Sequence, residues 1–352
     1  MGGKRHRSQK QAGIVRVPSA PRSPARRYNP SQLEHLPVSY QDISDHFDKA
    51  GEVPLFLLRV EAIRRIEAAT GRPLICYVAK THNVQPSAPA YIEDADLLGF
   101  SDLVQSTSGS MVDVLIISNG GSVEATERIV RLLRNRFTSI RFLVPANAYS
   151  AATLMAFCSN EILMDALGTL GPIDPQINGV PARAMLRAVE SLEERLRDQG
   201  PRSLTAYIPM LQKMDLHVLE ICRSAQALSK ELASQYLSTY MLHVAAGDPT
   251  VAGIVNHFSD YDLHKSHARS IDRTKCSELG LLVSDLEANS GLHDLVRSLA
   301  NQYELLFDKI PFIKLYENPR GINWGRQAQR LALEVPLQAP PQMPPGAPTR
   351  ST

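Results

Sequence analysis

The stretch LIISNGGSVEATERIVRLLR, residues 115–134, joins three patterns that together indicate the fold. An apolar run ends in Asn119-Gly120-Gly121-Ser122 and passes directly into a helical pattern. The run belongs to VDVLIIS at 112–118, which is typical of a strand covered on both faces of a parallel sheet. Two glycines at the end of a buried strand let the backbone turn sharply or let another molecule approach it closely. The turn is therefore a tight strand–helix connection or a ligand contact.

The same alternation of strands and helices continues on both sides of this stretch. Further strands are predicted at 72–81, 140–145 and 161–165, and helices at 53–70, 91–105, 123–136 and in the short segment after Tyr149. After residue 180 the pattern becomes mainly helical, with helices predicted at 181–198, 205–245, 250–257 and 291–308, and a strand and turn at 311–325. The sequence thus predicts an α/β fold of mostly parallel strands wrapped by helices, with a helical second half.

The charge of the chain is unevenly distributed. Of the 38 Lys and Arg residues, eight lie in residues 1–30, which contain no acidic residue, so the remainder carries 30 basic against 36 acidic residues. We expect 1–30 to be a disordered basic tail, 50–330 to be the folded domain, and 335–352 to be a Pro-rich disordered tail. The basic tail is a solubilising leader, or it touches nucleic acid or an acidic membrane surface.

The cysteines and the lengths of the apolar runs indicate where in the cell the protein is found. The four cysteines are widely spaced without CxxC pairing, as in reduced core residues; they are Cys76, Cys158, Cys222 and Cys276. The basic tail has no apolar core of a secretory signal, and no stretch approaches the roughly 18 apolar residues of a membrane span. We expect a cytoplasmic protein without a transmembrane segment.

Two strand–turn–helix units supply candidate chemistry. Both turns are expected at the carboxyl edge of the sheet, where open α/β sheets bind ligands. Gly120 and Gly121 offer backbone N–H groups, and Ser150 offers a hydroxyl beside the N–H of Ala151. A hydroxyl for attack and two N–H groups for an oxyanion form a minimal set for acyl transfer. The plainer alternatives are a helix N-cap for Ser150 and a tight turn for the glycines.

Three successive segments carry a family resemblance. They are LIISNGGSVEATERIVRLL, VPANAYSAATLMAFCSNEILMDALGTLGPIDPQI and KSHARSIDRTKCSELGL. Together they resemble the serine dehydrogenase proteinase family, which is related to the Clp-type peptidases and signal peptide peptidase A. The resemblance runs from about 53 to 326 and is most specific across 112–177. It implies a crotonase-like (Clp-type) α/β fold and a serine peptidase.

The resemblance also implies roles for individual residues. By position, Ser150 is the nucleophile, and Gly120 and Gly121 with Ala151 form the oxyanion hole. Two departures stand out: the glycine loop has Asn119 where relatives usually have proline, and Ala151-Ala152 follows Ser150 where a glycine is common. Neither departure removes a reactive atom.

The general base has three candidates. Clp-type peptidases have a histidine about twenty-five residues after the serine, whereas this chain has Asp174 there and no histidine from 151 to 216. His267 lies where the Clp-type acid would fall, so His267 and Asp174 can exchange roles, since triads are defined by geometry and not by order. Lys80, at the end of the first strand, and Lys213, at a serine–lysine spacing, are the other candidates; a lysine base requires burial. We prefer His267, whose alternative is a structural histidine.

Other polar residues receive structural interpretations. Asp94 and Asp96 are read as helix-start carboxylates, and His217 as a core or interface residue. His257, His264 and His267 do not have a zinc spacing, so no metal is expected. No GxxxxGK[ST] loop is present. We therefore expect no cofactor.

The sequence favours a cytoplasmic serine peptidase acting on peptides or unfolded protein. We expect a homo-oligomer, with a regulatory partner as a further possibility. The first alternative is an inactive scaffold or binding protein on the same fold, in which the basic tail binds nucleic acid or a partner. The second alternative is a coenzyme A-dependent hydratase or thioesterase, ranked last because no adenine-binding pattern is evident.

Overall fold

The computed structural model describes residues 14–16, 29–50, 52–85, 88–177, 179–200, 208 and 216–327. Within them, an eight-stranded sheet has the order β1-β13-β12-β2-β3-β4-β6-β11. The parallel strands are β2 (Leu74–Ala79), β3 (Met111–Ile117), β4 (Ser139–Val144), β6 (Glu161–Met164) and β11 (Val283–Asp285). The antiparallel hairpin β12 (Phe312–Glu317) and β13 (Asn323–Gln327) extends the sheet beside β2. The predicted mostly parallel α/β sheet is therefore confirmed.

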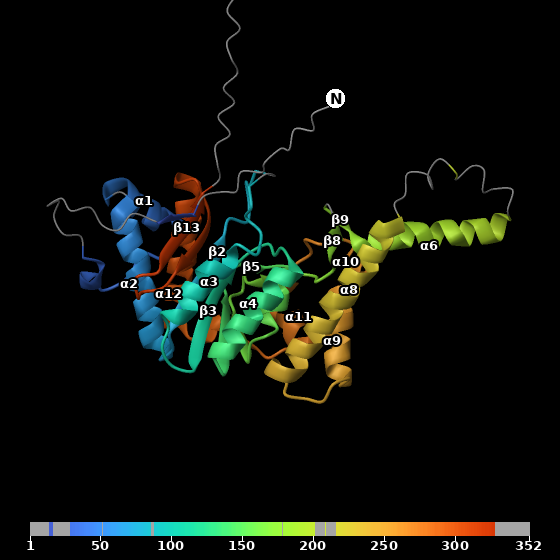
Figure 1. Cartoon of the computed structure of the whole chain (residues 1–352). Helices are drawn as coiled ribbons and strands as arrows, with labels where there is room; N and C mark the ends of the chain where they lie inside the picture. Colours follow the sequence, from blue (N-terminus) through green and yellow to red (C-terminus); the bar gives the residue numbers. More distant parts are fainter. Residues whose placement is uncertain are drawn as a thin grey trace, which may run out of the picture.

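Helices cover both faces of this sheet (Figure 1). On one face lie α1 (Tyr40–Ala50), α2 (Glu52–Thr70) and α12 (Ser290–Lys309). On the other face lie α3 (Asp96–Gln105), α4 (Val123–Arg136), α5 (Ala151–Ala156), α8 (Leu216–Tyr236) and α9 (Pro249–Ser259). Along β2, Ile75 and Tyr77 join the core of the second face, whereas Leu74 and Cys76 join the core of the first. The strand is buried at every position because successive side chains point to opposite, covered faces.

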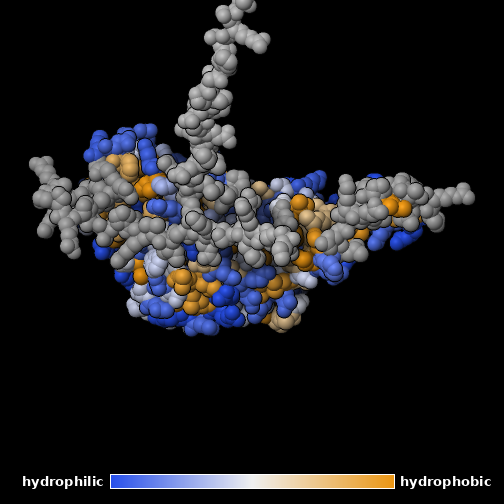
Figure 2. All heavy atoms as spheres, turned by 45° about the horizontal axis from the view of Figure 1, so that its top comes forward, coloured by the Kyte–Doolittle hydropathy of each residue, from blue (hydrophilic) through white to orange (hydrophobic). Residues whose placement is uncertain are grey.

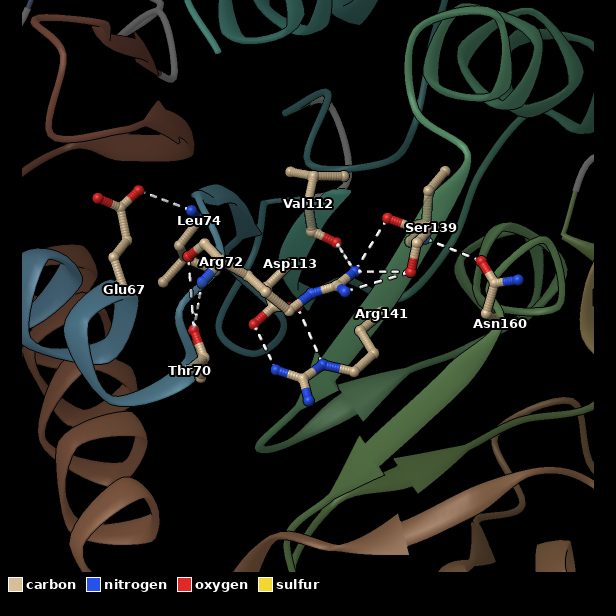
Figure 3. A network of polar contacts seen from close by, with 10 residues as sticks. Glu67, Thr70, Arg72, Leu74, Val112, Asp113, Ser139, Arg141 and Asn160 are labelled. Carbon is tan, nitrogen blue, oxygen red and sulfur yellow. Dashed lines mark hydrogen bonds and ion pairs between the residues drawn. The ribbon is translucent and has the colours of Figure 1, made fainter. Parts of the chain in front are cut away.

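A buried carboxylate ties three strands together at the amino end of the sheet (Figure 3). Asp113 on β3 is fully buried and accepts hydrogen bonds from Arg72 Nε at 2.6 Å and Arg141 Nη2 at 2.7 Å. Arg72 also donates to the Ser139 carbonyl at 2.9 Å. The two guanidinium groups compensate the buried charge. This network lies at the edge of the sheet opposite to the glycine turn that follows β3.

Part of the helical second half extends beyond the body (Figure 1). A short hairpin of β8 (Gln176–Ile177) and β9 (Val180–Pro181) leads to α6 (Ala182–Gln199), which projects away from the sheet. Its first turns pack on α8 through Ala182, Leu186, Leu219 and Cys222. Figure 2 shows hydrophobic residues among hydrophilic ones at this end of the molecule. The remaining short elements are η1 (Pro30–Gln32), η3 (Leu237–Met241), α10 (Tyr261–His264), α11 (Arg273–Glu278) and η4 (Leu286–Ala288).

Three local predictions differ from the structure. Ile14–Arg16 forms β1, which pairs with β13, although it lies in the segment predicted as a disordered tail. The exposed edge of β13 can pair with any short extended segment, and charge composition does not reveal this. The helix predicted over 91–105 begins only at Asp96, because Ile92 pairs with Gly121. The helix predicted over 205–245 contains α8 and the π-helix η3 (Leu237–Met241), and residues 242–245 are not helical. Residues 1–13 and 17–28 of the basic tail and the whole Pro-rich tail lie outside the described residues. No helix among the described residues has the length and apolar character needed to cross a membrane.

Candidate active site

The turn after β3 is held in an unusual backbone conformation. Gly120 has φ 94° and Gly121 has φ 154°. A Cβ atom on Gly120 would lie 2.7 Å from Ser150 Cβ, and one on Gly121 would lie 2.3 Å from the backbone nitrogen of Ile92. Glycine is thus needed both for the positive φ and for the close approach of two other segments. The structure therefore shows the tight strand–helix connection, packed against two other chain segments, and contact with a ligand stays a prediction.

The two glycine N–H groups differ in their partners. Gly120 N donates to Ser118 Oγ at 3.1 Å. Ile92 N donates to the Gly120 carbonyl at 2.7 Å, and Ser122 N donates to the Ile92 carbonyl at 2.9 Å, which leaves the Gly121 N–H between these two bonds. Among the described residues, the Gly121 N–H has no acceptor. Gly121 is therefore the glycine whose N–H is available to a ligand.

Ser150 begins α5 in a strained conformation. Its φ of 53° and ψ of −119° lie outside the regions that residues with a Cβ usually adopt, and its side chain does not cap the helix. Ser150 thus occupies the N-cap position of α5, but its hydroxyl does not make the capping hydrogen bond that the N-cap alternative requires. A serine on such a strand-to-helix turn presents its hydroxyl outward, and the next N–H, that of Ala151, lies at the free amino end of the helix.

A small three-stranded sheet aligns the segments that carry the candidate residues. β5 (Asn147–Ala148) lies just before Ser150, β7 (Thr169–Leu170) precedes Asp174, and β10 (Ile271–Asp272) follows His267. β5 pairs in parallel with β7, and β10 pairs with β7 in antiparallel orientation. Three segments distant in sequence are therefore brought to one place by backbone hydrogen bonds.

His267 and Asp174 form an ion pair or hydrogen bond. His267 Nδ1 lies 2.8 Å from Asp174 Oδ1. The Asp174 side chain is 1% exposed and that of His267 is 20% exposed. Asp174 Oδ2 is buried and has no hydrogen-bond partner within the described residues. A buried carboxylate at Nδ1 fixes the imidazole ring and leaves Nε2 as the atom that exchanges protons.

One cavity collects most of the candidate residues. It has a volume of about 1220 Å³ and is lined by Gly120, Gly121, Ser150, Ala151 and His267. Its other walls include Leu154 of α5, Ile173 and Ile177, and Ala225 and Leu228 of α8. No hydrogen bond joins Ser150 Oγ to His267 in this structure, although both residues line the cavity. The site thus combines a hydroxyl, an imidazole and two N–H groups around a cavity that both polar and apolar side chains line.

The lysine candidates occupy other places. Lys80 donates through Nζ to the Phe307 carbonyl at 2.8 Å, near the end of α12, and it does not line the cavity. The proximity expected of Lys80 to Ser150 is therefore not seen, because a carbonyl at the end of a helix attracts the ammonium group instead. Lys213 lies outside the described residues.

The aspartates and histidines that we expected to have structural roles lie outside the catalytic candidates, with the exception of His267. Asp94 pairs with Arg128 at 2.8 Å on the surface, whereas Asp96 at the start of α3 is fully buried. His217 is exposed on α8 and is not a core residue. The ring centroids of His257 and His264 lie 5.0 Å apart, whereas His267 pairs with Asp174, so the three histidines do not form one cluster.

Thr153 and Ile92 also support the site, and neither was predicted from the sequence. Thr153 Oγ1 donates to the Ala148 carbonyl at 2.6 Å and accepts from Gly171 N at 3.0 Å, which joins α5 to the loop that carries Asp174. The sequence did contain a signal for Thr153: it is a threonine three residues after the candidate nucleophile, and a threonine hydroxyl can form hydrogen bonds to nearby backbone groups. Ile92 gave no signal, because an isolated bridge of one residue has no pattern.

A comparison with known families gives a match over part of the chain. Residues 54–208 match the family of ClpP-like SDH-type serine proteinases. The resemblance to the serine dehydrogenase proteinase family is therefore confirmed, as is the Clp-type class of the α/β core. The matched segment includes the glycine turn, Ser150 and Asp174, and it ends before His267.

Two curated relatives are uncharacterized proteins of Methanocaldococcus jannaschii. One is 26% identical over 193 residues, which cover 53% of this chain and 65% of the relative. The other is 38% identical over 79 residues, which cover 22% of this chain and 28% of the relative. The chain thus spans less than two thirds of the length of these relatives.

Two solved structures are similar to parts of the chain. One is the 1510-N membrane-bound stomatin-specific protease in complex with a substrate peptide, with 17% identity, a TM-score of 0.33, and coverage of 55% of this chain and 71% of that chain. The other is ClpP1 from Listeria monocytogenes, with 10% identity, a TM-score of 0.34, and coverage of 65% and 99%. Because the sequence identities and TM-scores are low, the candidate site is argued from the residues of this chain alone.

Proposed function

We propose that this protein is a serine peptidase with Ser150 as nucleophile, His267 as general base and Asp174 as the carboxylate that orients His267. The observation that carries the proposal is the 2.8 Å contact between His267 Nδ1 and Asp174 Oδ1 beside the cavity that Ser150 lines. A serine hydroxyl is a weak nucleophile unless a neighbouring base takes its proton. Lys80 is dropped as a base because its ammonium group binds the Phe307 carbonyl.

The first half of the reaction forms an acyl-enzyme. His267 Nε2 takes the proton of Ser150 Oγ, and Oγ forms a bond to the carbonyl carbon of the substrate peptide. The negative charge that develops on the carbonyl oxygen is held by the N–H groups of Gly121 and Ala151. Gly120 shapes this oxyanion hole through its conformation, since its own N–H is bonded to Ser118. The C–N bond then breaks, and the leaving amine receives the proton from His267.

The second half releases the product by hydrolysis. A water molecule gives a proton to His267 Nε2 and attacks the acyl carbon, and Ser150 Oγ leaves and takes that proton back. The hydrogen bond between Ser150 and His267 is expected to form in the substrate complex, because catalytic hydrogen bonds are often long before substrate binds. No metal or organic cofactor takes part in the proposed steps.

The substrate is proposed to be a peptide or a segment of unfolded protein. A cavity of about 1220 Å³ exceeds the roughly 300–1,000 Å³ of pockets for small molecules and has room for several residues. We further propose a cytoplasmic homo-oligomer, in line with the Clp-type resemblance and with four free, buried cysteines. A regulatory partner, and contact of the basic tail with nucleic acid, remain proposals from the sequence.

The test is labelling with a fluorescent fluorophosphonate, a probe that phosphonylates activated serines. We expect the purified protein to be labelled and Ser150→Ala to be unlabelled, with mass spectrometry locating the adduct on Ser150. The matched control is Ser106→Ala, which removes another half-buried serine hydroxyl, at the end of α3, and should be labelled at the normal rate.

Two results would contradict the proposal. Absence of labelling in the folded wild-type protein would favour the inactive scaffold on the same fold. Labelling of Ser150→Ala at the normal rate would place the reactive serine elsewhere. If labelling behaves as expected, hydrolysis of unfolded protein by the wild type and not by Ser150→Ala establishes the peptidase.

A further inference from the structure

The segment of residues 91–95 is hydrogen-bonded to the turn that forms the proposed oxyanion hole. Ile92 is fully buried and makes two backbone hydrogen bonds to this turn, one to the Gly120 carbonyl and one from Ser122 N. The Gly121 N–H lies between these bonds, and Gly121 contacts Ile92 so closely that a Cβ atom would not fit. The position of residues 91–93 therefore determines where the Gly121 N–H points.

A buried lysine on a distant strand fixes this segment. Lys314 of β12 is 0% exposed. Its Nζ donates to the Tyr91 carbonyl at 2.8 Å, to Glu93 Oε1 at 3.0 Å and to Asp96 Oδ1 at 2.7 Å. An ammonium group has three N–H donors, and all three are used here. Two of the acceptors, in Tyr91 and Glu93, belong to the residues next to Ile92, so the lysine binds the segment on both sides of that residue.

The acceptors are themselves held in place. Asp96 is fully buried and also accepts hydrogen bonds from Tyr77 Oη at 2.9 Å and from the hydroxyl of Tyr316. Arg326 of β13 binds Glu93 Oε1 at 2.9 Å. A buried ammonium is costly unless it is paired and fully hydrogen-bonded, and this one is. Such a network has one well-defined geometry, in contrast to a lysine on the surface.

We propose that Lys314 is a positioning residue for the oxyanion hole: it fixes residues 91–93, which in turn aim the Gly121 N–H into the cavity. This inference rests on the proposed function of the site. Lys314 does not line the cavity, although Tyr91 does, so the lysine acts through residues 91–93 and not directly on the substrate. Loss of the lysine therefore weakens stabilisation of the transition state more than binding of the substrate.

The test compares Lys314→Met with Tyr316→Phe. Both variants alter a buried β12 side chain that binds Asp96, but only Lys314→Met frees the Tyr91 carbonyl and Glu93. We expect Lys314→Met to slow fluorophosphonate labelling by roughly 10- to 100-fold, somewhat less than removal of an oxyanion donor. For a cleaved peptide, kcat should fall while KM changes little. Tyr316→Phe should stay within about twofold of the wild type, because it retains all three Lys314 contacts.

Hydrogen exchange separates this inference from the proposed function. Lys314→Met should speed amide exchange in the segments 90–95 and 118–123, with β6 (Glu161–Met164) unchanged, whether or not the protein is a peptidase. If the wild type is not labelled but these segments loosen, the proposed function fails and the structural link stands.

Three results would overturn the inference. They are labelling of Lys314→Met at the wild-type rate, an equal loss in Tyr316→Phe, and unchanged exchange in 90–95 and 118–123. If Lys314→Met does not fold because Asp96 is left as an unpaired buried charge, the double variant Lys314→Met with Asp96→Asn removes both charges and takes its place, with the same expected results.

Discussion

His267 Nδ1 lies 2.8 Å from Asp174 Oδ1, so the two residues meet in the chain order Ser150, Asp174, His267. The imidazole and the carboxylate exchange the positions that the Clp-type resemblance gives them. The roles in a triad depend on geometry, and unrelated serine hydrolases use several chain orders. The exchange leaves the carboxylate in the more buried position, where it holds the ring without contact with the cavity.

Replacing the carboxylate by an amide tests the exchanged roles. Asp174→Asn retains the shape but presents an amide that can stabilise the wrong tautomer of His267, so kcat should fall by roughly 10³- to 10⁴-fold. Labelling by fluorophosphonate should slow in parallel. The melting temperature should change little, because the loss comes from the proton transfer and not from unfolding. Steady-state kinetics of Asp174→Asn beside His267→Gln provide the measurement. A small loss in Asp174→Asn with a large loss in His267→Gln would show that His267 works without the carboxylate.

Gly121 permits a test of the oxyanion hole. Gly121→Ala places a methyl group within 2.3 Å of Ile92 backbone atoms and at a φ of 154°, so the turn must move. We expect a roughly 10²-fold or greater loss of labelling, as for removal of an oxyanion donor. Gly71→Ala is a control at another positive φ with no atom near the added Cβ, and it should lower stability without slowing the labelling of the folded protein. Normal labelling of folded Gly121→Ala would assign the oxyanion contact to other groups.

Thr153 couples the nucleophile helix to the Asp174 loop. Thr153→Val removes the hydroxyl that joins Ala148, Gly171 and α5 and leaves the buried Gly171 N–H without its acceptor. Loss of a buried hydrogen-bond partner costs about 1–3 kcal/mol. We expect the free energy of unfolding in urea to fall by about that amount and labelling to slow. Thr126→Val, at a buried threonine of α4, is the matched control and should affect stability alone.

The sequence predicted β2, β3, β4 and β6 because they are apolar runs, whereas the edge strands β1 and β11, with three residues each, were not predicted. The helices were predicted where their apolar residues have a clear period. The positions of α4 (Val123–Arg136) and α12 (Ser290–Lys309) follow directly from that pattern. The pairs of two-residue strands that align Ser150, Asp174 and His267 are too short to leave a periodic signal. The buried network around Lys314 was equally hidden, because its partners are over 200 residues apart in the chain. Long-range polar contacts of this kind depend on tertiary packing and not on local sequence.

The stability of the protein should depend on pH through His257. Burial lowers the pKa of His257, and the neighbouring His264 and Lys275 lower it further. The folded state therefore favours the neutral imidazole, and its contribution to stability is present above the unfolded pKa of about 6.5 and is lost as the pH falls below it. We expect His257→Gln to lose less stability than the wild type between pH 7.5 and pH 5.5, measured by urea unfolding. Equal losses in the two proteins would assign the acid sensitivity to other groups.

Asp113 should matter for stability and not for catalysis. Asp113→Asn leaves the guanidinium groups of Arg72 and Arg141 without their buried carboxylate, at the amino end of β3 (Figure 3). Breaking a buried ion pair costs about 3–5 kcal/mol, and the partial exposure of Arg141 brings the expected loss to the lower end of this range. Urea unfolding should show this loss, whereas fluorophosphonate labelling of the folded variant should stay within about twofold, because the site lies at the opposite edge of the sheet. Slow labelling of fully folded Asp113→Asn would instead mean that a change at the amino end of β3 reaches the Gly121 turn through the strand itself.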